Sequence, residues 1–215
     1  MNAQSVIINE INADNPGTDT QEFIELYGLP GTPLDGMTLV LFDGSSDQSY
    51  LSIDLDGFSL NADGFFVIAD SAVIGADYYF TNLTANIQNG ADAVALYFAN
   101  ATDFPNGTTA NGTSLIDAQV YYTQDQNDPG LIAALTLDIL SPGYTIIDDT
   151  ALSTTIEYSL SLIPDGGSSF NYSGFVLQAP TPGALNYPPC NAGNFTLNGL
   201  DANSACIELL PLSVQ

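Results

Sequence analysis

The 215 residues of this chain include no lysine, no arginine and no histidine, against 25 aspartates and glutamates. Without histidine there is no Ser-His-Asp triad and no imidazole general base. Without lysine there is no Schiff base or P-loop cation, and without arginine there is no bidentate clamp for phosphate or carboxylate. Zinc sites of the Cys/His type are excluded as well, because the chain has only two cysteines. What remains for site chemistry is the carboxylate group.

The same absence restricts the partners of the chain. Nucleic-acid affinity rests largely on Lys and Arg side chains that neutralise phosphates, and a net charge of -25 repels anionic membranes. No run of residues approaches the ~20 apolar residues of a membrane span. We therefore expect no nucleic-acid partner and no membrane insertion.

Hydrophobic residues make up 45% of the chain and include 11 Tyr and 11 Phe, enough for a packed core. Short apolar or alternating runs, separated by Gly, Pro, Asn and Asp, predict strands. They lie at 5–11, 22–27, 37–42, 50–55, 64–69, 91–98, 115–122, 156–163 and 175–178. A single short helix is expected within 131–140, because Asp128-Pro129 is a helix-start signal. The pattern is typical of an all-β antiparallel sandwich or barrel.

Read in order, eight segments resemble the lamin tail domain as it occurs in secreted bacterial proteins. They are Val6–Ile11, Gln21–Tyr27, Leu34–Leu39, Phe65–Ile68, Asn89–Leu96, Leu115–Ala118, Ser161–Gly166 and Pro180–Asn186. The resemblance implies an immunoglobulin-like β-sandwich that serves as a binding or structural module and not as a catalyst. Met37 and Leu162 stand where that family usually has Trp and Arg. The chain therefore keeps the scaffold of the family while its basic and Trp positions are substituted.

The resemblance ends at residue 186, so we expect a sandwich domain over 1–186 and a cysteine-bearing segment over 187–215. Cys190 and Cys206 close a loop of ~15 residues, and a disulfide there would contribute roughly 3 kcal/mol. The alternative is two buried free thiols. We predict the disulfide, because the segment between the cysteines has little core of its own. A disulfide implies an oxidising compartment, and hence a secreted or cell-surface protein.

Five carboxylates are candidate ligands for a hard divalent cation such as Ca2+. They are Glu10, Asp14, Asp19, Glu22 and Asp117. The first four lie on or beside the loop from Asn9 to Glu22, and Asp117 stands inside an apolar strand. With no basic side chain in the chain, a buried carboxylate must hydrogen-bond to amides, bind metal or stay protonated. The alternative is a solvated acidic surface that salt screens.

Two hypotheses for function follow. The first is a non-catalytic extracellular structural or adhesive module that associates with its own copies or with other surface proteins. Divalent cations between acidic faces would relieve the self-repulsion of the chain. The second is a carbohydrate-binding or glycan-cleaving domain that uses tyrosines, as in the pairs Tyr78-Tyr79 and Tyr121-Tyr122, and a pair of carboxylates. A glycosidase needs two carboxylates ~5 to 9.5 Å apart, and 25 carboxylates meet that distance by number alone. That spacing therefore identifies no active site. Because the usual catalytic groups are absent as well, we expect no enzymatic activity.

Overall fold

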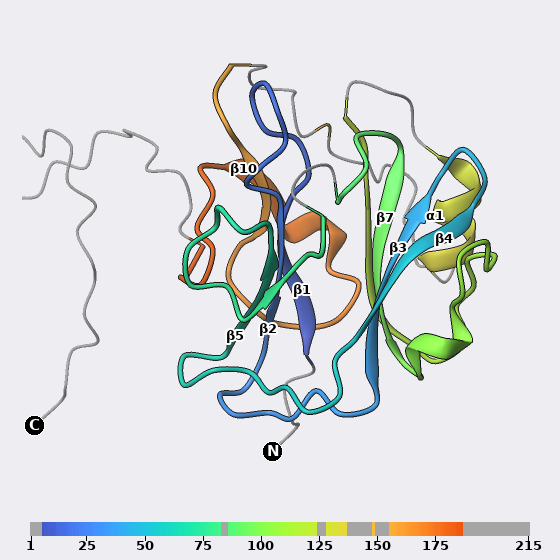
Figure 1. Ribbon diagram of the computed structural model, residues 1–215, viewed down its shortest axis with the longest axis horizontal. Coiled ribbons are helices and arrows are strands. Elements are labelled where there is room, and N and C mark those ends of the chain that lie inside the picture. The colour runs from blue at the N-terminus through green and yellow to red at the C-terminus, as the bar shows by residue number, and fades with distance from the viewer. Residues whose placement is uncertain (1–5, 83–85, 124–127, 137–147, 149–154, 187–215) are drawn as a thin grey trace, which may run out of the picture.

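The computed structural model describes residues 6–82, 86–123, 128–136, 148 and 155–186 (Figure 1). Most of the described elements are strands, and they belong to two sheets. The first sheet contains β1 (Ile7–Asn12), β2 (Phe23–Tyr27), β5 (Phe65–Ala69), β6 (Tyr78–Tyr79), β9 (Ser159–Leu162) and β10 (Phe175–Gln178). The second sheet contains β3 (Met37–Asp43), β4 (Gln48–Asp54), β7 (Asp92–Phe98) and β8 (Leu115–Tyr121).

The strand order is β10-β9-β1-β2-β5-β6 in the first sheet and β4-β3-β7-β8 in the second. All strand pairs are antiparallel except β5 with β6. In Figure 1 the first sheet stands on the left and the second on the right, with the helix α1 (Pro129–Leu135) beyond the second sheet. The prediction of an all-β protein is therefore confirmed at the level of two packed sheets.

The main core lies between the sheets. Ile8 and Ile11 of β1 meet Leu39 of β3 and Leu96 of β7 in one buried cluster. Ile8 and Ile11 both reach this core, although they are three positions apart, because Asn9 is an extra residue at a break in the register of β1 with β2. The same break places Glu10 directly opposite Glu25 of β2.

The outer faces of the sheets are covered as well. Leu131 and Leu135 of α1, together with Phe104, pack on the outer face of the second sheet. Val73 packs with Phe23 and Val67 of the first sheet. Burial on both faces explains why many strands read as continuous apolar runs rather than as alternating ones.

Differences from the sequence-based expectations are local. The helix begins at Pro129, with Asp128 as its N-cap through a bond from Leu131 N of 2.8 Å. It ends at Leu135, and residues 137–140 of the expected helix lie outside the described residues. The two-residue strand β6 carries no pattern that could have predicted it. Among the described residues, no helix has the length and apolar character needed to cross a membrane.

Candidate functional site

Two fully buried glutamates lie side by side on the first sheet, on the side away from the main core. Glu10 and Glu25 are cross-strand partners on β1 and β2, and both are 0% exposed. Segment 179–186, which follows β10, reaches both of them through hydrogen bonds. Glu10 and Glu25, together with Asp165, hold this segment against the sheet. We call this group the clasp: Glu10, Glu25 and Asp165 as acceptors, with Thr181, Gly183 and Asn186 of the segment.

Glu10 binds the start of the segment. The backbone N of Thr181 donates to Glu10 Oε1 at 2.9 Å, and Thr181 Oγ1 lies 2.9 Å from Glu10 Oε2. The hydroxyl of Ser159 in β9 also donates to Glu10 Oε1. One carboxyl group of β1 therefore joins a neighbouring strand and a segment about 170 residues further along the chain.

Glu25 and Asp165 bind the rest of the segment. Gly183 N donates to Glu25 Oε2 at 2.6 Å, and Asn186 N donates to Asp165 Oδ1 at 3.0 Å. Asn9 connects the two carboxyl groups, because its Nδ2 lies 2.9 Å from Glu25 Oε1 and 2.9 Å from Asp165 Oδ1. The residue at the β-bulge is thus the bridge between two acids.

Two oxygens of the clasp compete for the hydrogen of one hydroxyl group. Thr181 Oγ1 lies 2.9 Å from Glu10 Oε2 and 2.7 Å from Asn186 Oδ1, which also accepts from Gln178 Nε2 at 3.1 Å, and the hydroxyl has a single hydrogen for the two oxygens. The Asn186 amide keeps this orientation because its Nδ2 donates to Asn9 O and Leu162 O. A proton on Glu10 Oε2 that donates to Thr181, with Thr181 donating to Asn186, satisfies both contacts.

The burial of the clasp shifts its two glutamates in the direction of protonation. Burial raises the pKa of the Glu10 carboxyl, against the hydrogen bonds from Ser159 and Thr181. Burial also raises the pKa of Glu25 to about 8, and the charge of Asp165, like that of Glu10 when it is ionised, acts in the same direction. No lysine, arginine or histidine exists in the chain to stabilise the ionised forms.

A second buried pair lies where β2 begins and β5 ends. Glu22 and Asp70 are both 0% exposed. Glu22 accepts from Asn86 N at 2.6 Å and from Ile87 N at 3.2 Å, and Asn86 Nδ2 donates to Asp70 Oδ1 at 2.6 Å. Burial raises the pKa of Glu22 to about 8, and the charges of Asp70 and Asp19 add to the rise. These acids anchor the segment that starts at residue 86.

The remaining predicted ligands are placed in two further locations. Asp14 and Asp19 meet at the amide of Asn89, whose Nδ2 lies 3.1 Å from Asp14 Oδ1 and 3.0 Å from Asp19 Oδ2. Asp117 is 4% exposed and accepts from Ile8 N at 3.0 Å and from Phe170 N at 2.7 Å. Burial raises the pKa of Asp117 to about 6 despite these bonds.

The five predicted ligands are therefore not gathered at one point. Asp14 and Asp19 are brought together, and Glu22 lies near enough to Asp19 for their charges to interact. Glu10 and Asp117 each have their own set of donors elsewhere. Within the described ranges, no three Asp, Glu, Cys or His side chains form a group that could hold a metal ion. The calcium site remains a prediction.

The sequence analysis missed Glu25, Asp70 and Asp165. Glu25 and Asp70 carried a usable signal, because each is a carboxylate within or at the end of an apolar strand, as Asp117 is. Asp165 stands in a turn and carried no such signal.

A hollow of about 550 Å³ opens on the second sheet. Its lining includes Asp43, Asp92 and Asp128. Asp92 Oδ1 accepts from Gly44 N at 2.9 Å. Gly44 has to be glycine, because a Cβ there would lie 1.8 Å from the carbonyl oxygen of Ala91. The hollow is therefore a concave and acidic part of the surface, closely packed at Gly44.

Comparisons with protein-family models, with curated proteins and with solved structures found no match to this chain. Cys190, Cys206 and the whole segment 187–215 lie outside the described residues. The predicted disulfide and the predicted domain boundary at residue 186 therefore stay predictions.

Proposed function

We propose that this chain is a non-catalytic structural or adhesive module of the extracellular space, with an immunoglobulin-like sandwich similar to the lamin tail domain. The observation that carries the proposal is the use made of the buried carboxyl groups. Glu10, Glu25, Glu22 and Asp117 each accept hydrogen bonds from segments far away in the sequence. An acid that is occupied by backbone donors in this way strengthens the fold and has little freedom to act on a substrate.

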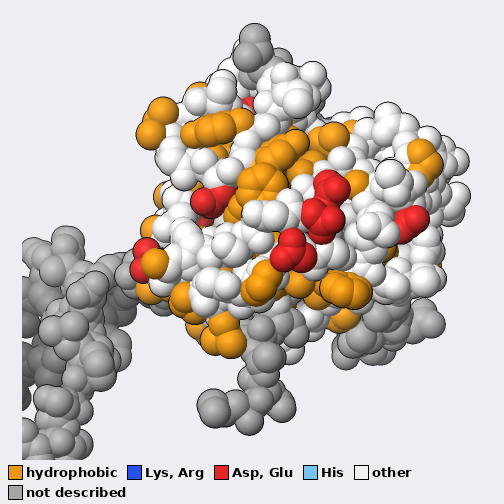
Figure 2. Space-filling model, turned by 60° about the horizontal axis from the view of Figure 1, so that its bottom comes forward, with side chains coloured by type: hydrophobic (Ala, Val, Ile, Leu, Met, Phe, Trp, Pro, Cys, Tyr) orange, Lys and Arg blue, Asp and Glu red, His pale blue; other side chains and the backbone are white. Residues whose placement is uncertain are grey.

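The acidic surface supports association that depends on cations. The face in Figure 2 carries carboxylates next to hydrophobic side chains, and the hollow adds Asp43, Asp92 and Asp128. Two copies of a chain with net charge -25 repel each other unless counter-ions lie between them. Calcium suits this role because it binds carboxylate oxygens from flexible and incomplete sites. We therefore propose homo-oligomers, or contacts with other surface proteins, in which divalent cations join acidic faces.

Sedimentation velocity and electron microscopy test this proposal on the full chain in millimolar calcium, in chelator, and in sodium at matched ionic strength. We expect ordered filaments, sheets or discrete oligomers in calcium alone. The variant Asp43→Asn should weaken assembly, while Asp63→Asn, at an exposed turn outside the hollow, should leave it unchanged. A monomer under all three conditions would contradict the proposal. Turnover in a hydrolase screen that one Asp or Glu substitution abolishes would contradict its non-catalytic part.

A further inference from the structure

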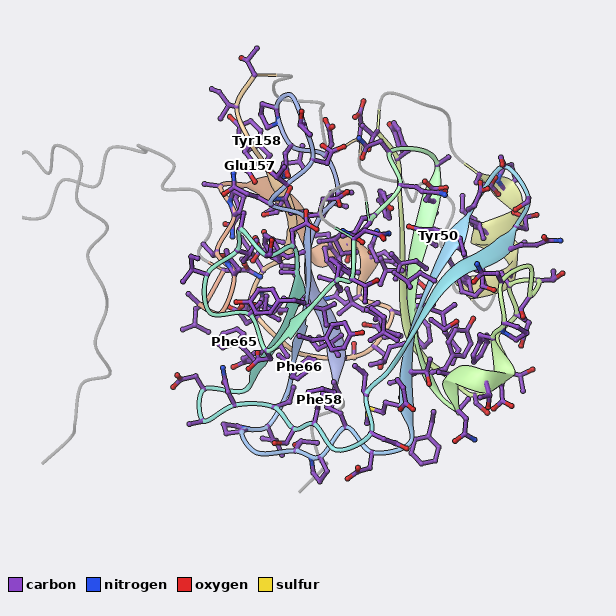
Figure 3. All side chains as sticks on the ribbon, viewed as in Figure 1. Tyr50, Phe58, Phe65, Phe66, Glu157 and Tyr158 are labelled. Atoms are coloured by element: carbon purple, nitrogen blue, oxygen red, sulfur yellow. The ribbon has the colours of Figure 1, made fainter. Side chains whose placement is uncertain are left out.

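A groove of about 350 Å³ lies between β4 of the second sheet and residues 78–82 and 86–88. Three aromatic side chains and three amide side chains form most of its lining: Tyr50, Tyr78, Phe80, Asn82, Asn86 and Gln88. In Figure 3, Tyr50 is labelled on the second sheet, on the side that faces the first sheet. The volume falls within the range of roughly 300–1,000 Å³ that small-molecule sites occupy.

The aromatic side chains of the groove are held in place. Tyr78 packs edge-on against Phe58, with ring centroids 6.1 Å apart, and Phe58 packs in the same way against Phe66 at 5.2 Å. Figure 3 labels Phe58 and Phe66 at the first sheet. Tyr50 OH accepts a hydrogen bond from Gln88 N at 3.0 Å. These contacts prepare rigid apolar surfaces, so a ligand would not have to pay for ordering them.

The polar groups of the groove retain unused hydrogen-bonding capacity. The Tyr50 hydroxyl accepts from Gln88 N and keeps its own hydrogen to donate. Asn82 and Gln88 are exposed, and their side-chain amides bond to none of the described residues. Asn86 is 4% exposed and is fixed by its bond to Asp70. A ligand in the groove would meet neutral donors and acceptors of both kinds.

Charge narrows the class of ligand. The ten described residues that line the groove include no carboxylate, although the chain carries 25. No basic side chain exists to bind an anion, and no acid in the groove pairs with a cation. The fitting ligand is neutral, bears many hydroxyl groups and has an apolar face for the aromatic rings. We propose that this groove binds a neutral oligosaccharide. The inference does not depend on assembly of the chain, so either proposal can fail without the other.

Isothermal titration and amide chemical-shift mapping test the proposal on dilute full-length protein in chelator. The probes are neutral oligomers of glucose (β- and α-linked), xylose, mannose and N-acetylglucosamine, and oligogalacturonate is the anionic comparison. We expect at least one neutral oligomer to bind and to shift the amide signals of Asn86 and Gln88. We expect oligogalacturonate not to bind.

Three variants locate the site. Gln88→Ala removes an exposed amide and Tyr78→Ala removes a ring, and each should weaken binding about ten-fold, which corresponds to ~1.4 kcal/mol. Tyr79→Ala is the matched control, since Tyr79 is the next residue, is 44% exposed and does not line the groove. Thermal unfolding of each variant checks that it is folded, and Gln88→Ala keeps the test decisive if Tyr78→Ala is not. The proposal is overturned if no neutral oligomer binds at millimolar concentration. It is also overturned if Gln88→Ala binds as tightly as the parent, or if Tyr79→Ala weakens binding equally.

Discussion

Asn9 donates its side-chain amide to Glu25, with Nδ2 2.9 Å from Glu25 Oε1. The same nitrogen lies 2.9 Å from Asp165 Oδ1, and Asn89 bridges Asp14 and Asp19 in the same manner. In a chain without basic residues, asparagine occupies the place between two acids that lysine or arginine takes elsewhere. An amide supplies two hydrogens but no charge. The remaining negative charge must be removed by protons or offset by cations from solution.

Protonation makes the stability of the fold depend on pH. The pKa of Glu25 rises from 4.5 to about 8 on folding. Between these values the folded protein holds a proton that the unfolded chain has released. The free energy of unfolding should therefore fall as the pH rises from about 4.5 to 8, by ~1.4 kcal/mol per pH unit for one proton. Glu22, whose pKa is also raised to about 8, acts in the same direction.

Urea unfolding at intervals from pH 4 to 9 measures this slope. The Gln side chain of Glu25→Gln cannot titrate. The free energy of unfolding of this variant should therefore fall less steeply with pH than that of the parent, by the contribution of one proton. Its stability at low pH should be lower, because the new amide NH2 faces Asn9 Nδ2 or Gly183 N. Asp63→Asn at an exposed turn is the control and should keep the parent slope. Equal slopes for Glu25→Gln and the parent would mean that Glu25 is ionised in the folded state.

The clasp should lose stability when its shared hydroxyl is removed. Thr181→Val keeps the shape of the side chain but removes the hydroxyl that contacts Glu10 Oε2 and Asn186 Oδ1, and Asn186 Oδ1 then keeps only its bond from Gln178 Nε2. We expect a loss of about 1–3 kcal/mol in the free energy of unfolding. Thr181→Ser keeps the hydroxyl and should lose less. If the serine and valine variants are equally stable, the hydroxyl does not hold the segment.

Infrared spectroscopy tests the protonation of Glu10 separately. A protonated carboxyl group has a carbonyl stretch distinct from that of a carboxylate, and the parent at neutral pH should show it. Glu10→Gln should remove part of this signal, and Thr181→Val should shift it because the acid loses its acceptor. An unchanged spectrum in Glu10→Gln would place the clasp proton elsewhere.

The sequence was sufficient to predict the strands and one buried acid, but it did not predict which acids lie together. Tertiary burial on both faces strengthened the strand signal, so β1, β3 and β7 were each predicted within two residues of their observed bounds. Asp117 was singled out because it stands inside an apolar strand, whereas Glu10 was assigned to the end of the loop from Asn9 to Glu22, although it is fully buried in β1. The contact of Glu10 with Thr181 joins positions 171 residues apart. It depends on how segment 179–186 lies on the sheet, and the residue pattern of neither β1 nor segment 179–186 predicts that placement.

The predicted disulfide between Cys190 and Cys206 can be tested by mass alone. Intact protein treated with an alkylating reagent without reductant should gain no mass. After reduction it should gain the mass of two alkyl groups. A double Cys→Ser variant should unfold at a lower temperature if the bridge supports segment 187–215 and that segment supports the sandwich. Two alkylated thiols in the unreduced protein would refute the bridge and the oxidising compartment inferred from it.

Calcium should stabilise the folded chain by more than charge screening. A cation that binds only the folded state adds RT ln(1 + [L]/Kd), about 2.7 kcal/mol at a hundredfold excess over Kd. For a chain of this size such a gain corresponds to a rise in melting temperature of roughly 5–10 °C. Sodium at matched ionic strength supplies the screening of the -25 charge and nothing more. We therefore expect a larger rise in millimolar calcium than in matched sodium, measured on dilute protein.

The acids beside Asn89 are the part of the predicted site that the fold brings together, so they provide the decisive variants. Asp19→Asn combined with Glu22→Gln changes two of the predicted ligands, Asp19, which meets Asp14 at Asn89, and Glu22, which interacts with Asp19. This double variant should respond equally to calcium and to sodium. Asp63→Asn removes one exposed charge elsewhere and should retain the calcium response. If the parent already responds equally to the two ions, its carboxylates attract cations only as a diffuse atmosphere. Protons alone would then account for the stability of the buried acids.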